Sequence, residues 1–340
     1  MSQPKISRLS YCQYLLSTQT NYTLTNYAAH VEHLSHDMVN RYLRQEKLTP
    51  QLVWEHTQGQ IKTSEQGYIV FDDSVLDKNY SKHIEGVRWQ YSGNAHDVIR
   101  GIGLVNCIYV NPETGQFWLI DYRIFDPERD GKSKVEHVKD MLNQVFYQKQ
   151  IPFKTVLIDS WYASNSFMLF VSDLGKLFYC PVKRNRLARQ PNSHEHYQRL
   201  TELKWSEEEL KTGKSIRLKG MPSGFAMKMF RVPISTNRTD YVVSNDPSQH
   251  CSDDTRKVCA IRWYIEQFHR EIKQLTGIEK CECRKQRIQR NHIACAVLVW
   301  VRLKQIAYDT QQTVYQIKRE LLTDYLIQEL KNPSVSMDFA

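Results

Sequence analysis

The 340-residue sequence lacks long apolar runs, internal repeats and low-complexity tracts. No stretch approaches the ~18 consecutive apolar residues that a membrane-spanning helix needs, which argues against a membrane protein. No apolar segment of the signal-peptide type follows the basic residues of positions 1–16. We therefore expect a cytoplasmic protein with no membrane partner. The apolar content of 41% is sufficient for a hydrophobic core.

The sequence also lacks a second close cysteine pair that would complete a zinc knuckle. Its eight cysteines are dispersed, and the pair Cys281-x-Cys283 is one residue shorter than the usual spacing. Together with His292 and Cys295, this pair could in principle hold zinc. Reduced thiols in the core or on the surface are the favoured interpretation, because cytosolic cysteines stay reduced.

The positive charge of the chain is in excess. The formal net charge is +9, and basic residues cluster in 183–189 and 257–290. Such an excess is compatible with a polyanionic partner, of which nucleic acid is the commonest.

Residues 1–60 are predicted to be helical, and residues 22–44 have the pattern of a helix-turn-helix. Thr25 is a candidate N-cap of the first helix, a turn is expected near His33-Leu34, and Ser35 is a candidate cap of the second helix. An ordinary helical hairpin would show the same pattern. In a helix-turn-helix, the outward polar residues of the second helix would contact DNA. These residues are His36, Asn40, Arg41 and Arg44.

The central part of the sequence predicts a mixed α/β core. Strands are expected at 68–71, 103–110, 117–123, 155–158 and 178–182, and helices at 134–148 and 164–174. This order is typical of a mixed sheet of the RNase H type with flanking helices. Residues 184–250 predict a β-rich insertion, with strand-like pieces at 215–218, 227–232 and 240–244. Helical periodicity returns at 254–274 and 291–306.

Carboxylates follow two of the buried strands. Asp72 and Asp73 come after 68–71, and Asp159 comes after 155–158. Carboxylates on neighbouring strands can hold divalent cations together. Each aspartate alone could simply end a strand, because aspartate is a common turn residue.

A third acidic residue lies in the predicted helix 254–274. Arg262 and Glu266 are four residues apart, and Lys273 follows seven residues later, so one helical face would carry all three. Solvated surface charges would give the same pattern.

These motifs resemble a known family. Arg262-(3)-Glu266-(6)-Lys273 is similar to the Tyr-(2)-Arg-(3)-Glu-(6)-Lys signature of cut-and-paste transposases of bacterial insertion sequences. The blocks around Asp72 and Asp159 resemble the first and second aspartate motifs of that family. The resemblance covers roughly residues 66–310 and implies an RNase-H-like DDE core with a β-rich insertion.

The resemblance implies a metal-dependent enzyme that cleaves and joins DNA. Asp72, Asp159 and Glu266 would hold two Mg²⁺ or Mn²⁺ ions, since hard oxygen ligands suit these cations. Asp73 is the alternative first ligand, but the sequence Asp72-x-Ser74 fits the family pattern better. The implied partners are the duplex terminal inverted repeats and the target DNA, bound by a homodimer. The protein would then be associated with the bacterial nucleoid.

Further residues would contact DNA in such an enzyme. Arg262 and Lys273 can donate hydrogen bonds to phosphates on either side of the site. Trp161, Tyr162 and Trp205 are candidates for stacking on unpaired bases. Core packing is the alternative for these aromatic residues, and for Trp205 it is favoured.

One departure from the signature leaves alternatives open. The signature tyrosine falls on Cys259, which cannot supply an aromatic hydroxyl. The competing hypotheses are a decayed transposase that binds DNA without cutting, a DNA-binding regulator and another RNase-H-like nuclease.

The predicted domains are 1–60 (DNA-binding), 66–183 (first part of the core), 184–250 (insertion), 251–310 (second part of the core) and 311–340 (helical tail).

Overall fold

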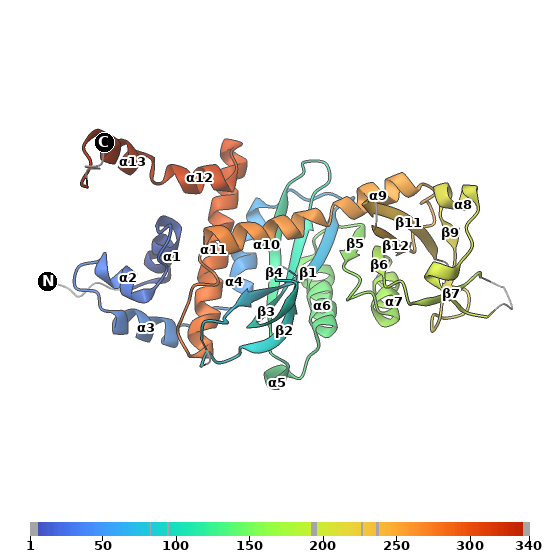
Figure 1. The fold of residues 1–340 in the computed structure, drawn as a ribbon, viewed down its shortest axis with the longest axis horizontal. Coiled ribbons are helices and arrows are strands. Elements are labelled where there is room, and N and C mark those ends of the chain that lie inside the picture. Colours follow the sequence, from blue (N-terminus) through green and yellow to red (C-terminus); the bar gives the residue numbers. More distant parts are fainter. Residues whose placement is uncertain are drawn as a thin grey trace. The chain divides into compact units, whose positions relative to one another are not determined.

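The chain forms two compact units in a computed structural model, which describes residues 6–335 except 82, 94, 192–195, 226, 236 and 237 (Figure 1). The first unit comprises residues 1–60, 75–103 and 268–340, and the second comprises 61–74 and 104–267. Among the described helices, none combines the length and the apolar character that a membrane crossing requires.

A mixed β-sheet forms the core of the second unit. Strands β1 (Tyr68–Asp77), β5 (Thr155–Ile158) and β6 (Leu177–Val182) are parallel neighbours in that order. On the other side of β1 lies β3 (Asp97–Val110), which also pairs with β4 (Phe117–Phe125). β1 and β3 each continue into the first unit. The predicted α/β class, a large mixed sheet of the RNase H type with flanking helices, is confirmed.

A tight hairpin turn connects β3 and β4. The Gly115 N–H donates to the carbonyl of Asn111, and Gly115 has a φ of +67°. Because residues with a side chain are strained at positive φ, glycine is the residue best suited to close the turn.

Two helical segments pack on this sheet in the second unit, and capping fixes where each begins. Helix α6 (Lys134–Asn143) starts with a reciprocal capping box between Ser133 and Glu136, and the single π-helical turn η2 (Gln144–Lys149) extends it. Helix α7 (Asn165–Asp173) is capped by the Ser164 hydroxyl. α6 packs against β4 and α7 against β6 (Figure 1). A short helix, α5 (Pro127–Asp130), precedes α6.

The insertion is rich in β-structure, as predicted, but part of it continues the main sheet. β12 (Arg238–Ser244) pairs with β6, and β11 (Lys228–Ser235) then joins β12 to β9 (Lys214–Ser215). A separate three-stranded sheet contains β7 (Leu187–Arg189), β8 (Gln198–Arg199) and β10 (Arg217–Leu218). The short helical elements are η3 (Leu200–Glu202) and α8 (Glu207–Thr212). The five-part domain division stays a prediction.

Helix α11 (Gln286–Thr310) is the buried centre of the first unit. Helices α1 (Arg8–Ser17), α3 (His36–Gln45) and α4 (Gln51–Thr57) pack against it. The buried Asn291 side chain of α11 donates to the carbonyls of Leu43 and Glu46 at the end of α3. The remaining elements are α2 (Leu24–Ala29), η1 (Gln58–Gln60), β2 (Arg88–Ser92), α12 (Val314–Glu320) and α13 (Thr323–Lys331).

The helical pair expected near the N-terminus is α2 and α3. Ser35 caps α3 through a bond from the Met38 N–H, as predicted. The prediction that Thr25 caps the first helix is wrong, because the Thr23 hydroxyl accepts the Asn26 N–H and starts the helix earlier. His33, in the turn between the helices, has a φ of 58°.

The helix expected over 254–274 is two helices. α9 (Ser252–Ala260) ends in tight turns in which the amides of Ile261 and Arg262 donate to carbonyls three residues earlier. α10 (Trp263–Leu275) then begins. The expectation of a single helix carrying Arg262, Glu266 and Lys273 on one face is therefore wrong, because Arg262 precedes α10.

Candidate active site

Asp72 and Asp159 lie on neighbouring parallel strands at matching positions. In the register between β1 and β5, Phe71 lies opposite Ile158, so the two aspartates follow a paired position. β5 ends there, whereas β1 continues to Asp77, which places Asp72 inside a strand rather than at its end. The parallel register brings both carboxylates to the same part of the sheet.

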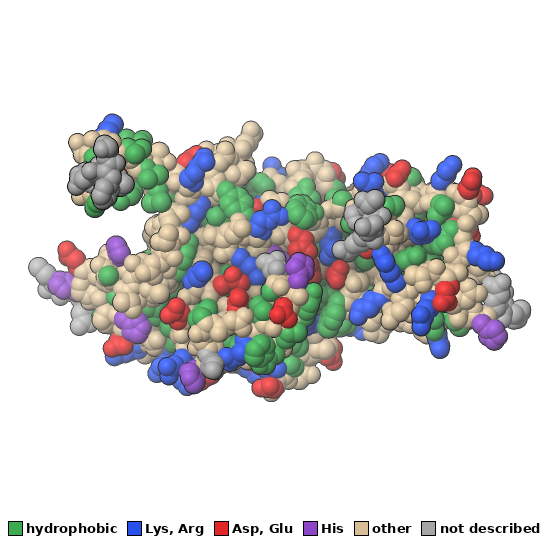
Figure 2. All heavy atoms as spheres, viewed as in Figure 1, with side chains coloured by type: hydrophobic (Ala, Val, Ile, Leu, Met, Phe, Trp, Pro, Cys, Tyr) green, Lys and Arg blue, Asp and Glu red, His purple; other side chains and the backbone are tan. Residues whose placement is uncertain are grey.

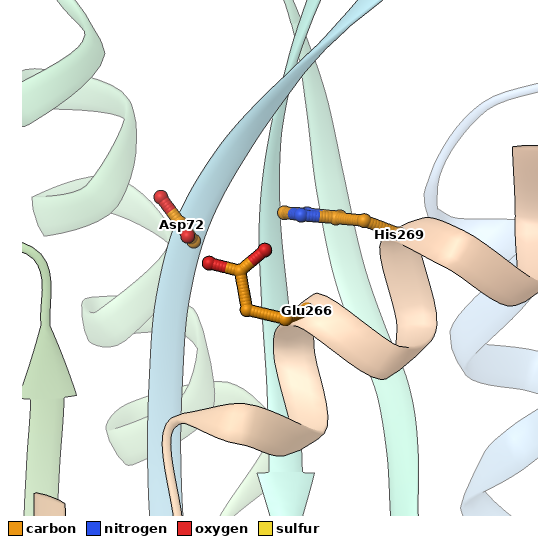
Figure 3. Close-up of side chains that lie close together, drawn as sticks. All are labelled: Asp72, Glu266 and His269. Atoms are coloured by element: carbon orange, nitrogen blue, oxygen red, sulfur yellow. The ribbon is translucent and has the colours of Figure 1, made fainter. Parts of the chain in front are cut away.

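Glu266 reaches this place from the first turn of α10. Figure 3 shows its side chain pointing toward Asp72, and carboxylate oxygens of the two residues lie within 4.8 Å of each other. One turn further along α10 is His269, whose ring lies beside Glu266 in the same view. The helix therefore brings an oxygen ligand to the pair of strands, with an imidazole next to it.

The guanidinium of Arg262 lies among all three carboxylates. Its Nη1 atom is 3.7 Å from Oδ2 of Asp72, 3.3 Å from Oδ1 of Asp159 and 3.9 Å from Oε1 of Glu266. The three side chains range from 15% exposed for Asp72 to 43% for Glu266, so the cluster is open to solvent on one side. One guanidinium cannot neutralise three carboxylates, and the ionised cluster keeps an excess of negative charge.

The electrostatics of Asp72 reflect its position inside the cluster. Burial raises the pKa of Asp72 well above its usual value, and the nearby carboxylates of Glu266 and Asp159 act in the same direction. The positive charge of Arg262 opposes this rise in pKa. A second positive charge at this place would favour the ionised form further.

Asp73 has different partners because successive strand residues point to opposite faces. Its Oδ2 accepts from Lys134 Nζ at 2.5 Å, and its Oδ1 accepts the Tyr162 hydroxyl at 2.6 Å. Both oxygens are thus engaged within the protein. The geometry favours Asp72 over Asp73 as the aspartate of the cluster.

The sequence between 8 and 203 matches the family model of the DDE superfamily endonucleases. The matched residues make up more than half of the chain and include both strand aspartates. This chain belongs to the DDE superfamily endonucleases. Enzymes of this superfamily use divalent metals, and Glu266 lies beyond the matched residues.

Solved structures resemble the chain at low sequence identity. A piggyBac transposase synaptic complex with hairpin DNA has a TM-score of 0.46 and 10% identity, covering 99% of this chain and 76% of that chain. Human ENDOV has a TM-score of 0.29 and 12% identity, covering 70% and 84%. Endonuclease V of Ciona intestinalis, in complex with a DNA 24mer, has a TM-score of 0.29 and 10% identity, covering 70% and 99%. No curated protein matches the sequence.

The cluster of this DDE superfamily protein has the chemistry of a divalent-cation site. Asp72, Asp159 and Glu266 offer hard oxygen ligands, which Mg²⁺ and Mn²⁺ prefer. The three acids surround a single cationic group, Arg262, and their excess negative charge suits a divalent cation. The residues present therefore fit the metal that the family uses.

The two predicted stacking residues after Asp159, Trp161 and Tyr162, differ in their exposure. Trp161 is 53% exposed and lies near the Lys134 ammonium, so its ring remains available for a base. The Tyr162 ring is fully buried and its hydroxyl is bound to Asp73, so the prediction that it stacks on DNA is wrong. Tyr162 instead holds Asp73 in place.

Trp205 lies half-buried in the insertion. Its ring is 5.9 Å from Lys214 Nζ and 5.9 Å from the Arg231 guanidinium carbon, both cation–π distances. These contacts accord with the packing role that the sequence favoured for Trp205. Its stacking on DNA stays a prediction.

Lys273 has partners of its own within the first unit. Its Nζ donates to the Val75 carbonyl at 2.7 Å and pairs with Glu279 at 3.1 Å. The side chain is only 11% exposed. A DNA phosphate would have to replace these partners, and the role of Lys273 in DNA binding stays a prediction.

Cys259, at the signature tyrosine position, lies half-buried in α9. Burial raises the pKa of its thiol to about 12, so the group is a neutral thiol at physiological pH. Tyr264 does not replace the missing tyrosine, because its ring packs against Phe117 at 5.2 Å between centroids.

The zinc set considered from the sequence is not supported. Both ring nitrogens of His292 are hydrogen-bonded, Nδ1 to the Tyr11 hydroxyl at 2.8 Å and Nε2 to the Gly277 carbonyl at 3.0 Å. A histidine engaged in this way has no free nitrogen for a metal. Within the described part of the chain, the cysteines are free thiols.

The predicted DNA-contacting residues of α3 are at its surface. His36, Arg41 and Arg44 are exposed, whereas Asn40 is half-buried and donates weakly to Cys283 Sγ at 3.7 Å. Val39 and Leu43 form the buried side of the helix. The exposed side of α3 is therefore polar and basic, and its binding to DNA stays a prediction.

Sequence reasoning missed two side chains of this region, Lys134 and His269. The spacing Glu266-x-x-His269 places both on one helical face and could have indicated His269. No local signal in the sequence indicates Lys134, because its pairing with Asp73 joins α6 to β1 across 61 residues.

Proposed function

We propose that this DDE superfamily protein is a transposase that cleaves and rejoins the ends of a bacterial insertion sequence. The observation that carries the proposal is the convergence of three carboxylates on Arg262. The signature spacing of Arg262, Glu266 and Lys273 favours a transposase over another RNase-H-like nuclease.

Asp72, Asp159 and Glu266 would hold two Mg²⁺ or Mn²⁺ ions. Bound there, such ions supply Lewis-acid activation of the nucleophile and charge stabilisation at the leaving oxygen of the phosphodiester. The protein's part is to fix the three carboxylates. β1 and β5 hold the two aspartates in register, and the start of α10 presents Glu266.

Arg262 has a part in placing DNA. A guanidinium donates hydrogen bonds and accepts none, so it suits a phosphate as well as a carboxylate. The Arg262 side chain is 25% exposed, so a DNA phosphate that approaches the cluster can reach its guanidinium. The exposed ring of Trp161 would contact a base nearby. We infer that the acting form is a homodimer on paired duplex ends, in the bacterial cytoplasm.

The test is cleavage of the protein's own element ends with Mg²⁺. Asp159→Asn should abolish cleavage and strand transfer while DNA binding stays within about twofold, because one charge is lost from the ligand set. Asp253→Asn, at an exposed acid of α9, is the matched control and should cleave normally. Equal cleavage by wild type and Asp159→Asn would contradict the proposal.

A decayed transposase is the second candidate, because Cys259 stands at the signature tyrosine position. Such a protein would bind the element ends but show no cleavage with Mg²⁺ or Mn²⁺. Binding without cleavage by the wild-type chain would therefore favour this alternative.

A further inference from the structure

A basic segment joins α10 to α11 in the first unit, and we call residues 279–285 the connector. It has neither helical nor strand structure. Cys281 is buried, whereas Lys280, Glu282 and Arg284 are exposed. The alternation places the charged side chains of the connector on its outer side.

Buried donors fix the start of the connector. The ammonium of Lys78, whose residue is fully buried, donates to the carbonyls of Glu279 at 2.7 Å and Cys281 at 2.9 Å. The buried amide of Gln289 donates to the carbonyls of Cys281 at 3.0 Å and Cys283 at 2.6 Å. An irregular segment held by this many buried bonds is ordered rather than loose.

Glu85 fixes the other end of the connector. Its N–H donates to the Arg284 carbonyl at 2.8 Å, and its carboxylate pairs with Lys285 at 2.7 Å and accepts the Gln286 N–H at 3.1 Å. The acidic side chain thus also caps the start of α11. The outward side chains of the connector are presented from a fixed backbone.

The connector and α3 line one pocket of about 500 Å³. The Asn40 amide of α3, which lines this pocket, donates to Cys283 Sγ of the connector at 3.7 Å. Tyr22 also lines the pocket; it is 6% exposed, and its buried hydroxyl has no hydrogen-bond partner among the described residues. A buried hydroxyl without a partner is unfavourable, and a ligand oxygen in the pocket would satisfy it.

Positive charge dominates the pocket. The basic residues that line it are His36, Arg44, Lys280, Arg284 and Lys285, against a single acid, Glu282. Of these, Arg44, Lys280 and Arg284 form no ion pair within the part of the chain that the structure describes. Figure 2 shows Lys and Arg side chains gathered where the lower end of α11 lies in Figure 1. Unpaired cations around a pocket favour an anionic ligand.

We propose that the connector and α3 together bind the phosphate backbone of duplex DNA. Lys280 and Arg284 contact phosphates from the connector, and Arg44 does so from α3. The Tyr22 hydroxyl donates to a phosphate oxygen inside the pocket. Such backbone contacts fix the register in which a recognition helix meets the bases. The exposed side of α3 would make the contacts to the bases. The inference rests on the proposed function, since it assigns the surface that would hold an element end.

The test compares two charge-matched double variants of the full chain. Lys280→Gln/Arg284→Gln removes the connector charges, and Arg319→Gln/Lys331→Gln removes two exposed charges of α12 and α13. Binding of a short fluorescent duplex of arbitrary sequence is measured by anisotropy over a series of salt concentrations. Each lost phosphate contact reduces the slope of log K against log salt by ~0.9.

The connector variant should lower this slope by about 1.8 and weaken binding about tenfold at low salt, while the control keeps the wild-type slope. Equal slopes for the two variants would overturn the proposal, as would an equal loss of binding to the single strand of the same sequence. Tyr22→Phe should weaken duplex binding without changing the slope, because it removes a donor and no charge. Unchanged binding by Tyr22→Phe would overturn the assignment of its hydroxyl.

These outcomes are separable from those of the proposed function. If the connector variant and the control variant show the same salt slope while cleavage still depends on Asp159, the proposed DNA-binding surface is refuted and the catalytic function is not. A connector-dependent salt slope in a protein that cleaves no DNA would refute the catalytic function and leave the surface standing.

Discussion

The Nη1 atom of Arg262 lies 3.3 Å from Oδ1 of Asp159. The same nitrogen is within 4 Å of carboxylate oxygens of Asp72 and Glu266. The arginine balances part of the charge of a cluster that would otherwise repel itself. It also lies where a divalent cation would compete for the same oxygens.

Arg262→Ala is therefore expected to strengthen Mn²⁺ binding to the metal-free protein by severalfold. The loss of a neighbouring positive charge makes the carboxylates better ligands for the cation. It also leaves the repulsion among the three carboxylates uncompensated, which makes the metal-free protein less stable. Isothermal calorimetry gives the affinity, and the rise in melting temperature on adding Mn²⁺ should exceed that of wild type. DNA cleavage should fall, because the phosphate loses its donor.

Arg262→Lys is the control, since it keeps the charge with a smaller set of donors. Its Mn²⁺ affinity should stay near wild type. Weaker Mn²⁺ binding by Arg262→Ala than by Arg262→Lys would show that the guanidinium supports the metal site rather than competing with it.

Tyr162→Phe should lower stability without removing a DNA contact. The buried hydroxyl bonds to Asp73 at 2.6 Å, and the loss of a hydrogen bond to a charged group costs about 1.5–3 kcal/mol. Urea unfolding measures this loss, and the affinity for a short duplex should stay within about twofold. Trp161→Ala is the comparison, and it should weaken DNA binding with little change in stability, since Trp161 is 53% exposed. The reverse pattern would restore the stacking role for Tyr162.

Cys259→Tyr, which restores the signature residue, should destabilise the protein. The Cys259 side chain is half-buried in α9, so the larger tyrosine ring would have to displace its neighbours. Overpacking of this kind costs about 1–3 kcal/mol. Cys259→Ser is the smaller control. If the tyrosine variant melts at the wild-type temperature and cleaves DNA faster, the position has space for a DNA-gripping side chain.

Local patterns in the sequence were sufficient for the two strand aspartates. The apolar runs before Asp72 and Asp159 form β1 and β5, and the parallel register aligns the positions that follow. The Arg262 to Glu266 spacing also placed both near the cluster, although a turn and not a helix holds Arg262. Periodicity could not locate that turn, since its residues are as helix-compatible as their neighbours.

Features that depend on distant parts of the chain could not be predicted. Tyr162 is fully buried, and its hydroxyl is bound to Asp73, 89 residues earlier. The pairing of β12 with β6 joins the insertion to the main sheet, and strand-like runs alone do not specify a partner. In the sequence the connector is recognisable only as part of a basic cluster, because the hydrogen bonds from Lys78 that fix it span about 200 residues.

His292 should make the first unit sensitive to acid. It is fully buried, its Nε2–H donates to the Gly277 carbonyl, and its Nδ1 accepts the Tyr11 hydroxyl, which suits the neutral ring. Burial, with the positive charge of Lys78, lowers its pKa from 6.5 to about 4. In the unfolded chain the ring gains a proton near pH 6.5, so this contribution to stability is complete above pH 6.5. It is lost progressively as the pH falls toward 4. A shift of this size corresponds to about 3 kcal/mol at the acid end.

Urea unfolding at pH 7 and pH 5 measures the loss. His292→Gln should be less stable than wild type at pH 7 but lose less stability between the two values. His56→Gln, at an exposed histidine of α4, should lose as much as wild type. An equal pH dependence of wild type and His292→Gln would show that other groups account for the acid sensitivity.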